Sequence, residues 1–484
     1  MSFIKETVKK VFGVVTNEIN AAIGYKQTFS ELLDNKDVPR AIGMLENRST
    51  EAVKNLIQYN TETHKVMNRP KKDIYDKKGN YLRSKDVNRI AIPYHKFINE
   101  IALVFMYGKP VLFSNATSDN KELEDKFKRL TDQLEESRFN AHLREAKRYA
   151  GCEGCSAMLF HTYQENGEPK MLIRVLAKSK NDDIYTLFDQ FSRLTVFARG
   201  YTTLDSERRS VYHYDIYTKE FIYYCQSVNG GAWEVDKQPN LARKIPVIVF
   251  IQEVEWDGTQ TIIERIEDAY SRNADSNDNF ADPALVATSD IVNTLPKQEE
   301  ESKLYVLKNG GDIKYLERSN ANQARQDEID ALDEQAMTKS FTPNITIEDL
   351  RGLANASGTT LEHVMMLGTI KADMRKESHD GYLSRTINLM KAIMGNVLDV
   401  KSGSYDELRV KHTFQPPFGE DVAAVIERLM KQFREGGMSL QTLLEKSPQI
   451  DNVEKEMERM KNEQAEADER RKQASIMDVF EPTI

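Results

Sequence analysis

The stretch IIERIEDAYSRNADSNDNFAD, residues 262–282, changes character halfway along a single helical pattern. Its first half sets apolar residues at helical spacing, namely Ile262, Ile263, Ile266, Ala269 and Tyr270. The second half, from residue 271, offers hardly any core-forming residue besides Phe280. This half of the helix has too narrow an apolar stripe to be buried by one chain alone, because a packed helix needs a wider apolar face. We expect neighbouring copies of the chain to cover it.

A short β segment and a second helix follow this stretch. The runs KLYVLK and DIKYL, at 303–308 and 312–316, look like strands on either side of two glycines, which predicts a hairpin. A helical pattern then resumes at 321–340, and its apolar positions are surrounded by acidic residues: Ala324, Ile329, Leu332 and Ala336. Two helices therefore bracket a small β insert.

The chain before this helix pair mixes helical and strand patterns. Residues 1–60 are helical in pattern, and a further helix runs through Phe97 and Phe105 before it stops at Gly108. Between residues 110 and 250, short β-branched and aromatic runs alternate with Gly, Asn, Asp and Ser, which is typical of antiparallel strands. The predicted fold class is therefore α+β, with several domains.

After the second helix of the pair, a flexible segment leads into a long predicted helix. The run GLANASG, residues 352–358, can bend sharply because Gly and Asn tolerate positive φ. Thr359 and Glu362 have the spacing of a capping box, which predicts a helix from Thr359 to about residue 396. A polar middle section suggests a bend near Gly381.

The C-terminal part reads as a strand, two helices and a charged tail. LRVKHTF, residues 408–414, is strand-like, and two helices follow with Gly436 and Gly437 between them and Ser439 as an N-cap. The last forty residues are dominated by EKEMERMKNEQAEADERRKQ, which favours a solvated tail over a packed helix.

Composition excludes several classes of protein. A net charge of −9 argues against a protein that coats nucleic acid, which needs a cationic surface, so any contact with DNA must be local or sliding. No apolar run approaches the length of about 20 residues that spans a bilayer, and the N-terminus reads as an amphipathic helix. Three cysteines are too few for a disulfide scaffold and indicate a reducing compartment, so the protein is expected to be intracellular when made.

The sequence lacks the common motifs of nucleotide-binding, metalloprotease and serine-hydrolase sites. It has no phosphate-binding loop, no dinucleotide fingerprint, no H-E-x-x-H and no G-x-S-x-G. Cys152 and Cys155 have a spacing that suits zinc, but Cys225, His161 and His213 would have to complete the site without a paired motif, so buried free thiols are favoured. The sequence therefore predicts no catalytic residue, no metal and no cofactor, although an enzyme with a cryptic site and a structural or adaptor protein remain alternatives.

The order of the segments resembles the portal proteins of tailed bacteriophages, especially those of long-tailed phages. The resemblance covers roughly residues 86–465, and the stretch 119–240 carries no matching motif. Five stretches carry it: NRIAIPYHKFINEIALVFMYGKPVLF; KIPVIVFIQ with IIERIEDAYSRNADSNDNFADPALV; YVLKNGGDIKYLE; LANASGTTLEHVMMLGTIKADMRKE; and GMSLQTLLEKSPQIDNVEKEMERMKNE.

This resemblance implies a ring, typically of twelve copies, at one vertex of the capsid, through which double-stranded DNA enters and leaves. It implies no enzymatic activity and a multidomain portal fold with wing, stem, clip and crown. The implied domains are an N-terminal helical segment (1–60), the wing (61–245), a first stem helix (246–283), the clip (284–317), a second stem helix (318–340), the tunnel loop (341–358), a long helix with a strand returning to the wing (359–417), a helical crown (418–475) and a tail (476–484).

The same resemblance implies functional residues and partners. The tunnel loop would expose to the DNA channel Asn344, Thr346, Glu348, Asp349, Arg351 and Asn355. The stem helices would pack through Ile262, Ile266, Tyr270, Ile329 and Leu332. The implied partners are other copies of the chain, the DNA, the terminase ATPase, the major capsid and scaffolding proteins and a head–tail adaptor, with no membrane. The implied location is the portal vertex of the virion, after synthesis in the host cytoplasm.

Overall fold

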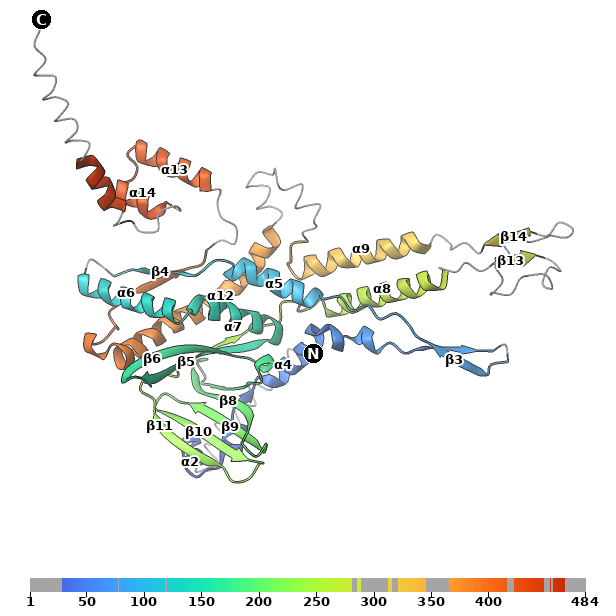
Figure 1. Ribbon diagram of the computed structural model, residues 1–484, viewed down its shortest axis with the longest axis horizontal. Coiled ribbons are helices and arrows are strands. Elements are labelled where there is room, and N and C mark those ends of the chain that lie inside the picture. Colours follow the sequence, from blue (N-terminus) through green and yellow to red (C-terminus); the bar gives the residue numbers. More distant parts are fainter. Residues whose placement is uncertain are drawn as a thin grey trace, which may run out of the picture. The chain divides into compact units, whose positions relative to one another are not determined.

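The computed structural model describes residues 28–76, 78–117, 120–280, 285–288, 312–315, 321–344, 365–415, 422–447, 453 and 456–465 (Figure 1). The chain divides into two units, one formed by residues 1–346 and 365–415 and the other by residues 347–364 and 416–484. Helices and antiparallel strands both build the first unit, so the predicted α+β class is confirmed.

A three-stranded antiparallel sheet, ordered β12-β5-β6, lies in the first unit, and its edge strand β12 is buried on both faces. Its strands are β5 (Cys155–Glu165), β6 (Glu168–Leu176) and β12 (Val247–Ile251). Successive side chains of a strand point to opposite faces. Val247 and Val249 of β12 join one hydrophobic cluster, whereas Ile248 and Phe250 join another. Burial of both faces explains why residues 244–252 form an almost continuous apolar run.

Helices cover one face of this sheet. The helix α7 (Phe139–Glu153) contacts β5, and α12 (Met366–Ile393) contacts β12. The helix α5 (Tyr94–Tyr107) contacts both α7 and α12, and α6 (Lys121–Glu136) contacts α7. Strand β15 (Val410–Thr413) pairs antiparallel with β4 (Leu112–Asn115), which confirms the predicted strand at 408–414 and returns the chain to the residues that follow α5.

A six-stranded antiparallel sheet packs on the other face, in the order β1-β7-β8-β9-β10-β11. Its strands are β1 (Glu46–Asn47), β7 (Asp183–Phe188), β8 (Leu194–Leu204), β9 (Ser210–Tyr217), β10 (Phe221–Val228) and β11 (Glu234–Pro239). The helices α2 (Phe29–Asp34) and α3 (Val38–Gly43) supply leucines and isoleucines to its far side, and α4 (Ser49–Tyr59) follows. The predicted meander of strands and the helical pattern of residues 28–60 are confirmed, and residues 1–27 lie outside the described part.

The long helix α12 runs without interruption through Gly381, where a bend was predicted, and becomes irregular only at the π-helical turn Met394–Leu398. Gly368, near its start, packs directly on α5, because a Cβ atom there would lie 2.5 Å from Phe105 Cζ. The predicted cap at Thr359 and Glu362 lies outside the described residues. The close approach at Gly368 fixes where α12 crosses α5.

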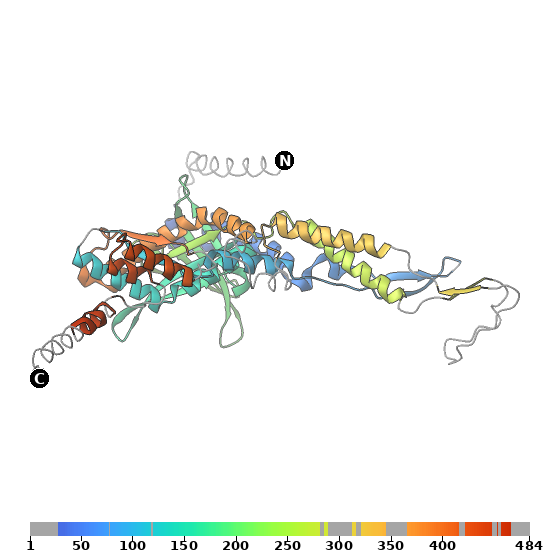
Figure 2. The same ribbon diagram turned by 90° about the horizontal axis from the view of Figure 1, so that it is seen from above.

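The two predicted stem helices correspond to α8 (Gln260–Phe280) and α9 (Ala321–Lys339). They lie side by side (Figure 2). The first begins later than the predicted residue 246, because residues 247–251 form strand β12 and a turn follows. Strand β14 (Asp312–Tyr315) pairs antiparallel with β13 (Leu285–Thr288), a partner that the sequence did not suggest. The predicted strand at 303–308 and both glycines of the predicted hairpin lie outside the described residues.

The second unit contains the two helices predicted near the C-terminus. They are α13 (Val422–Arg434) and α14 (Leu440–Lys446), and Gly436 between them has a φ of +75°. Ser439 is the N-cap of α14, since its hydroxyl accepts a bond from the Thr442 N–H at 3.2 Å. Residues 456–465 of the charged tail are helical. Of the helices in the described ranges, none is long and apolar enough to cross a membrane.

Candidate functional site

The turn between β12 and α8 anchors the helix pair in the core. Trp256 is almost completely buried there, and its ring stacks on Tyr59 of α4 with a centroid separation of 5.7 Å. The indole N–H donates to Gln58 Oε1 at 2.9 Å, so the polar edge of the ring is satisfied as well. Thr259 then donates its hydroxyl to the Trp256 carbonyl at 2.7 Å, immediately before α8 begins.

An apolar seam within one chain joins α8 to α9. Ile263 and Ile266 of α8 and Ala336 and Met337 of α9 belong to one buried cluster. At the surface of the same helix pair, Arg265 Nη2 lies 2.6 Å from Glu328 Oε1 and links α8 to α9. The apolar first half of α8 is therefore buried within one chain, by α9 and the neighbouring core.

The polar face of α8 from Glu267 to Asp275 is held by an extended segment, residues 86–93, which we call the strap. Three alternate N–H groups of the strap donate to side chains of α8: Ile92 to Glu267 at 2.8 Å, Ile90 to Ser271 at 2.9 Å and Asn88 to Asp275 at 2.6 Å. Two residues of extended chain span about 6.6 Å and four residues of helix about 6.0 Å, so the two repeats match. This ladder explains a helix face that has almost no apolar residues.

Buried histidines close the first turns of α8. His64 Nδ1 lies 2.6 Å from Glu267 Oε1, and its ring meets the edge of the His95 ring at 4.9 Å. His95 Nε2 in turn lies 2.7 Å from Gln260 Oε1. Burial lowers the pKa of His95 to about 4, so this ring is neutral at physiological pH and serves as a packed polar contact.

The ladder predicts a local effect for one serine. In Ser271→Ala the N–H of Ile90 loses its acceptor, and we expect the free energy of unfolding to fall by about 1 kcal/mol. Hydrogen exchange at Ile90 should become faster at the same time. Ser276→Ala is the matched control, because that side chain is partly buried on the same helix and makes no bond to the strap in the described structure. Equal effects of the two substitutions on Ile90 exchange would contradict the ladder.

The outward surface of α9 is acidic. The helix carries five carboxylates and two cationic side chains, and most of its residues from position 324 onward are exposed. Asp333 is an exception because it accepts a hydrogen bond from the Tyr94 hydroxyl. Asp327, Asp330 and Glu334 follow one side of the helix at spacings of three and four residues, and we call them the acidic stripe.

A buried charge cluster lies where α7 and α12 meet the turn before α8. The Glu255 carboxylate contacts the Lys147 ammonium of α7, lies 3.3 Å from Lys371 Nζ and 3.5 Å from Arg375 Nε of α12. Burial alone would raise the pKa of Glu255, but these three cations hold it well below its ordinary value. Burial lowers the pKa of Lys371 to about 8 in spite of Glu255, and it also lowers that of Lys147.

Lys371 also links the segment that enters α8 to the segment that leaves α9. Its ammonium donates to the Glu255 carbonyl at 2.6 Å, before α8, and to the Ser340 carbonyl at 2.8 Å, directly after α9. The Thr342 N–H donates to the Met337 carbonyl at 2.9 Å, so the chain that leaves α9 is fixed as far as this buried residue. Thr342 lies inside the predicted tunnel loop, 341–358, so the first residues of that segment are packed against the end of α9 instead of projecting from it.

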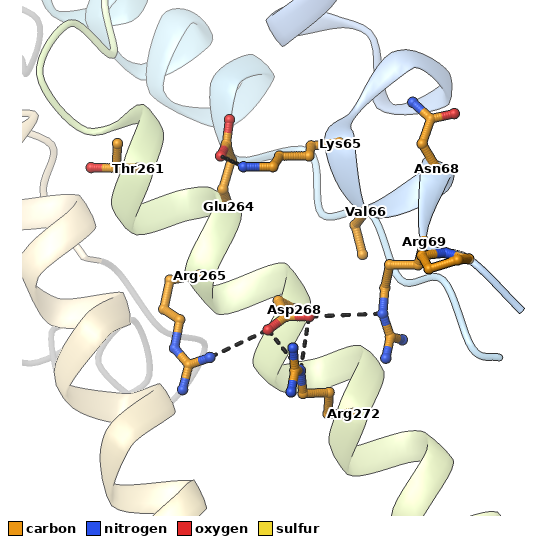
Figure 3. Close-up of a pocket in the computed structure, with 10 residues that line it drawn as sticks. Lys65, Val66, Asn68, Arg69, Thr261, Glu264, Arg265, Asp268 and Arg272 are labelled. Atoms are coloured by element: carbon orange, nitrogen blue, oxygen red, sulfur yellow. Dashed lines mark hydrogen bonds and ion pairs between the residues drawn. The ribbon is translucent and has the colours of Figure 1, made fainter. Parts of the chain in front are cut away.

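A surface groove between α8 and residues 65–70 is lined mainly by charged side chains (Figure 3). The Asp268 carboxylate forms ion pairs with Arg69 at 3.7 Å, with Arg265 at 3.3 Å and with Arg272 at 2.8 Å. Lys65 and Glu264 form another pair at 3.2 Å. The pairs of Lys65 with Glu264 and of Arg69 with Asp268 hold residues 65–70 on α8.

The residues predicted for the channel and the stem fall into four groups. Asn344 is exposed at the end of the described segment after α9. Ile266 and Ile329 are buried within the chain. The partly buried ones are Ile262, Tyr270 and Leu332. The remaining channel residues lie outside the described part of the chain: Thr346, Glu348, Asp349, Arg351 and Asn355.

The cysteines and histidines considered for zinc are not brought together. Cys152, Cys155 and Cys225 are free thiols in three different hydrophobic clusters. Burial raises the pKa of Cys155 and Cys225 to about 12, so neither thiol is a ready thiolate ligand at neutral pH. Within the described ranges, no group of three or more His, Cys, Asp or Glu residues is placed to hold a metal ion.

Sequence reasoning missed both the ladder and the charge cluster. The ladder had a detectable signal, because Glu267, Ser271 and Asp275 recur every four residues along one face of a helix. The cluster had none, since Lys147, Glu255 and Lys371 are separated by more than a hundred residues each and share no motif.

Comparison with known proteins agrees with the resemblance found in the sequence. The family described as "Phage portal protein, SPP1 Gp6-like" matches residues 44–470. A chain in the solved structure of the virion of a native gene transfer agent particle is similar at 11% identity and a TM-score of 0.37, over 72% of this chain and 88% of that one. No curated protein matches. Because the family match spans most of the sequence, the chain belongs to the SPP1 Gp6-like family of phage portal proteins, which are structural, non-enzymatic components of the phage head.

Proposed function

We propose that the chain forms a closed ring at one vertex of a phage capsid, and that double-stranded DNA passes through the centre of this ring during packaging and ejection. Membership of the portal family supports this proposal. The single observation that carries it is the helix pair α8–α9, which is anchored in the core through Trp256 and Lys371 and leaves an acidic outer surface on α9.

In this proposal α8 and α9 are the stem, residues 284–317 are the clip and residues 341–358 are the tunnel loop. Residues 61–245 form the wing, and residues 418–475 form the crown. The ring has twelve copies, and the terminase ATPase and the head–tail adaptor dock on it in turn. Asn344 then stands at the base of the tunnel loop, close to the Ser340 carbonyl that Lys371 fixes.

The charges of the stem suit a duplex that must slide. A lining rich in Lys and Arg would bind phosphates at every step and create deep energy wells. Each stem helix carries five acidic and only two basic residues, so a bore lined by the exposed parts of these helices would offer few cations that could hold the phosphates. Screening confines such electrostatic effects to about 8 Å at physiological ionic strength, so only residues that line the bore contribute.

The proposal predicts a large assembly with a hole. Size exclusion with light scattering should give a mass many times the 55.6 kDa of one chain. Negative-stain images of the same fraction should show rings with a central opening. A monomer that persists at several salt concentrations would contradict the proposal, and so would a compact oligomer without an opening.

A further inference from the structure

A two-stranded hairpin just before the strap has two chemically different faces. It is formed by β2 (Lys72–Tyr75) and β3 (Tyr81–Lys85), and no third strand pairs with them in the described structure. Asp76 accepts bonds from the N–H groups of Lys78 and Asn80, both at 2.8 Å, and Gly79 takes the positive φ that the turn requires. An isolated two-stranded hairpin is only marginally stable in water, so this one needs a further surface.

One face of the hairpin is closed by its own contacts. Tyr75 and Tyr81 meet edge to face with a centroid separation of 6.2 Å. The Tyr81 hydroxyl and Ser84 Oγ are 2.8 Å apart, and Ser84 donates to Asp73 at 2.6 Å. The polar groups on this face are therefore satisfied within the hairpin.

The opposite face is cationic and open. Lys72 is paired with Lys85 across the strands, and Ile74 is paired with Arg83, so we call these four residues the basic face. All three cations are exposed, and neither Lys72 nor Arg83 has an ion partner in the described part of the chain. An anionic partner could pair with Lys72 and Arg83 at the same time, because both lie on this face.

The acidic stripe of α9 lies on the other side of α8. The strap holds the root of the hairpin on the Glu267, Ser271 and Asp275 face of α8, whereas Arg265 reaches Glu328 of α9 from a position two residues, or more than half a turn, away. Figure 1 shows the hairpin and α9 on opposite sides of α8. Each chain thus carries a basic surface on one side of its helix pair and an acidic surface on the other.

We infer that the basic face of one copy docks on the acidic stripe of α9 in the neighbouring copy. This inference rests on the proposed ring, because a closed ring joins one side of every copy to the opposite side of the next. Lys72 and Arg83 meet Asp330 and Glu334, and Ile74 is covered between the two pairs of charges. Glu334 has no partner of its own among the described residues, and Asp330 accepts only a bond from Gln326 at 2.8 Å.

A second copy fits this surface better than a nucleic acid does. The hairpin offers a patch of three cations around an isoleucine, and the acidic stripe offers three carboxylates along one side of a helix on the same kind of chain. DNA would find no such apolar contact, and the other face of the hairpin carries Asp73. Binding of the hairpin to DNA is kept as an outcome of the test.

The test exchanges the charges of the two surfaces in the full-length protein. In Lys72→Glu with Arg83→Glu, and separately in Asp330→Lys with Glu334→Lys, we expect the fraction of chain in rings at low salt to fall at least tenfold. The variant with all four substitutions should restore rings, which also shows that loss in the parent variants is not misfolding. Lys121→Glu with Lys128→Glu on α6 is the control, since it makes the same change of charge at exposed sites and should leave assembly unchanged.

A disulfide gives a second readout of the same contact. On oxidation, Arg83→Cys combined with Asp330→Cys should form a series of disulfide-linked oligomers on a non-reducing gel. Arg83→Cys with Lys128→Cys should form none. The three native cysteines are buried. If the wild-type chain forms no ring, both this inference and the proposed function fail. If wild-type rings form, but the charge-reversed chains assemble normally and no disulfide-linked oligomers appear, only this inference is overturned. The same holds if reversal of Lys72 and Arg83 leaves rings intact and instead abolishes binding of a short DNA duplex.

Discussion

Replacement of Glu255 by alanine is expected to lower the free energy of unfolding by about 3–5 kcal/mol, because it leaves two buried ammonium groups without their counter-charge. Lys147 and Lys371 are both almost completely inaccessible to water and face the same carboxylate. The loss should also loosen the ends of α8 and α9, which Lys371 joins through the Glu255 and Ser340 carbonyls. Urea unfolding of the purified protein measures the first effect, and hydrogen exchange near Ser340 measures the second.

The double variant Lys147→Met with Glu255→Met reduces the unpaired buried charge. It leaves one ammonium group, that of Lys371, without its counter-charge instead of two, and it restores apolar volume, so it should be closer in stability to the wild type than Glu255→Ala is. If Glu255→Ala unfolded at the same urea concentration as the wild type, the cluster would have no stabilising role.

The pH dependence gives an independent check on Glu255. Its pKa in the folded chain is held below the 4.5 of a free glutamate, so the ionised carboxylate stabilises the folded state. This contribution is complete above about pH 4.5 and is lost as the pH falls below that value. The stability difference between the wild type and Glu255→Ala should therefore shrink as the pH falls below about 4.5.

Shortening residues 345–356 should leave rings nearly intact and severely reduce DNA packaging. In the proposed ring these residues narrow the bore, whereas assembly depends on the helix pair, the sheets and the crown. The chain is fixed on one side by Thr342 and on the other by the start of α12, and halving the length of a loop between them changes its closure free energy by only about 0.6 kcal/mol. Negative-stain imaging measures assembly, and packaging in vitro with purified terminase measures function.

A weaker variant of the same experiment tests the anchor of the loop. Thr359→Ala with Glu362→Ala removes the predicted capping box and should cost about 1 kcal/mol at the helix start, with a smaller packaging defect. Loss of rings on shortening would assign residues 345–356 to assembly. Normal packaging by the shortened protein would show that they do not contact the moving DNA.

The local periodicities of the sequence predicted most elements correctly. The apolar run at 244–252, the strand at 408–414 and the two C-terminal helices with Ser439 as a cap were all visible in short windows. The polar second half of α8, which was expected to need a neighbouring copy, is held by the strap of the same chain. In the first half, Ile263 and Ile266 are buried partly by Ala336 and Met337, which are seventy or more positions away. A hydrophobic pattern shows that a face is buried but does not show which residues bury it.

Polar contacts were the harder part to predict. The strap carries no apolar repeat, and its donors are backbone N–H groups, which every residue except proline has. The charge cluster joins Lys147, Glu255 and Lys371 only after the whole first unit has folded. The candidate channel could be located from the resemblance, but the residues that fix its base could not.

The ladder between the strap and α8 works as a molecular ruler, which limits how this protein can change in length. An insertion of one residue between Asn88 and Ile92 would turn the following N–H away from its acceptor, and one residue inserted between Glu267 and Asp275 would rotate the acceptors by about 100°. Only paired changes, two residues in the strap together with four in the helix, keep the register. A protein engineer who wishes to lengthen the stem should therefore add these blocks together, and natural variants of different stem length should differ by the same blocks.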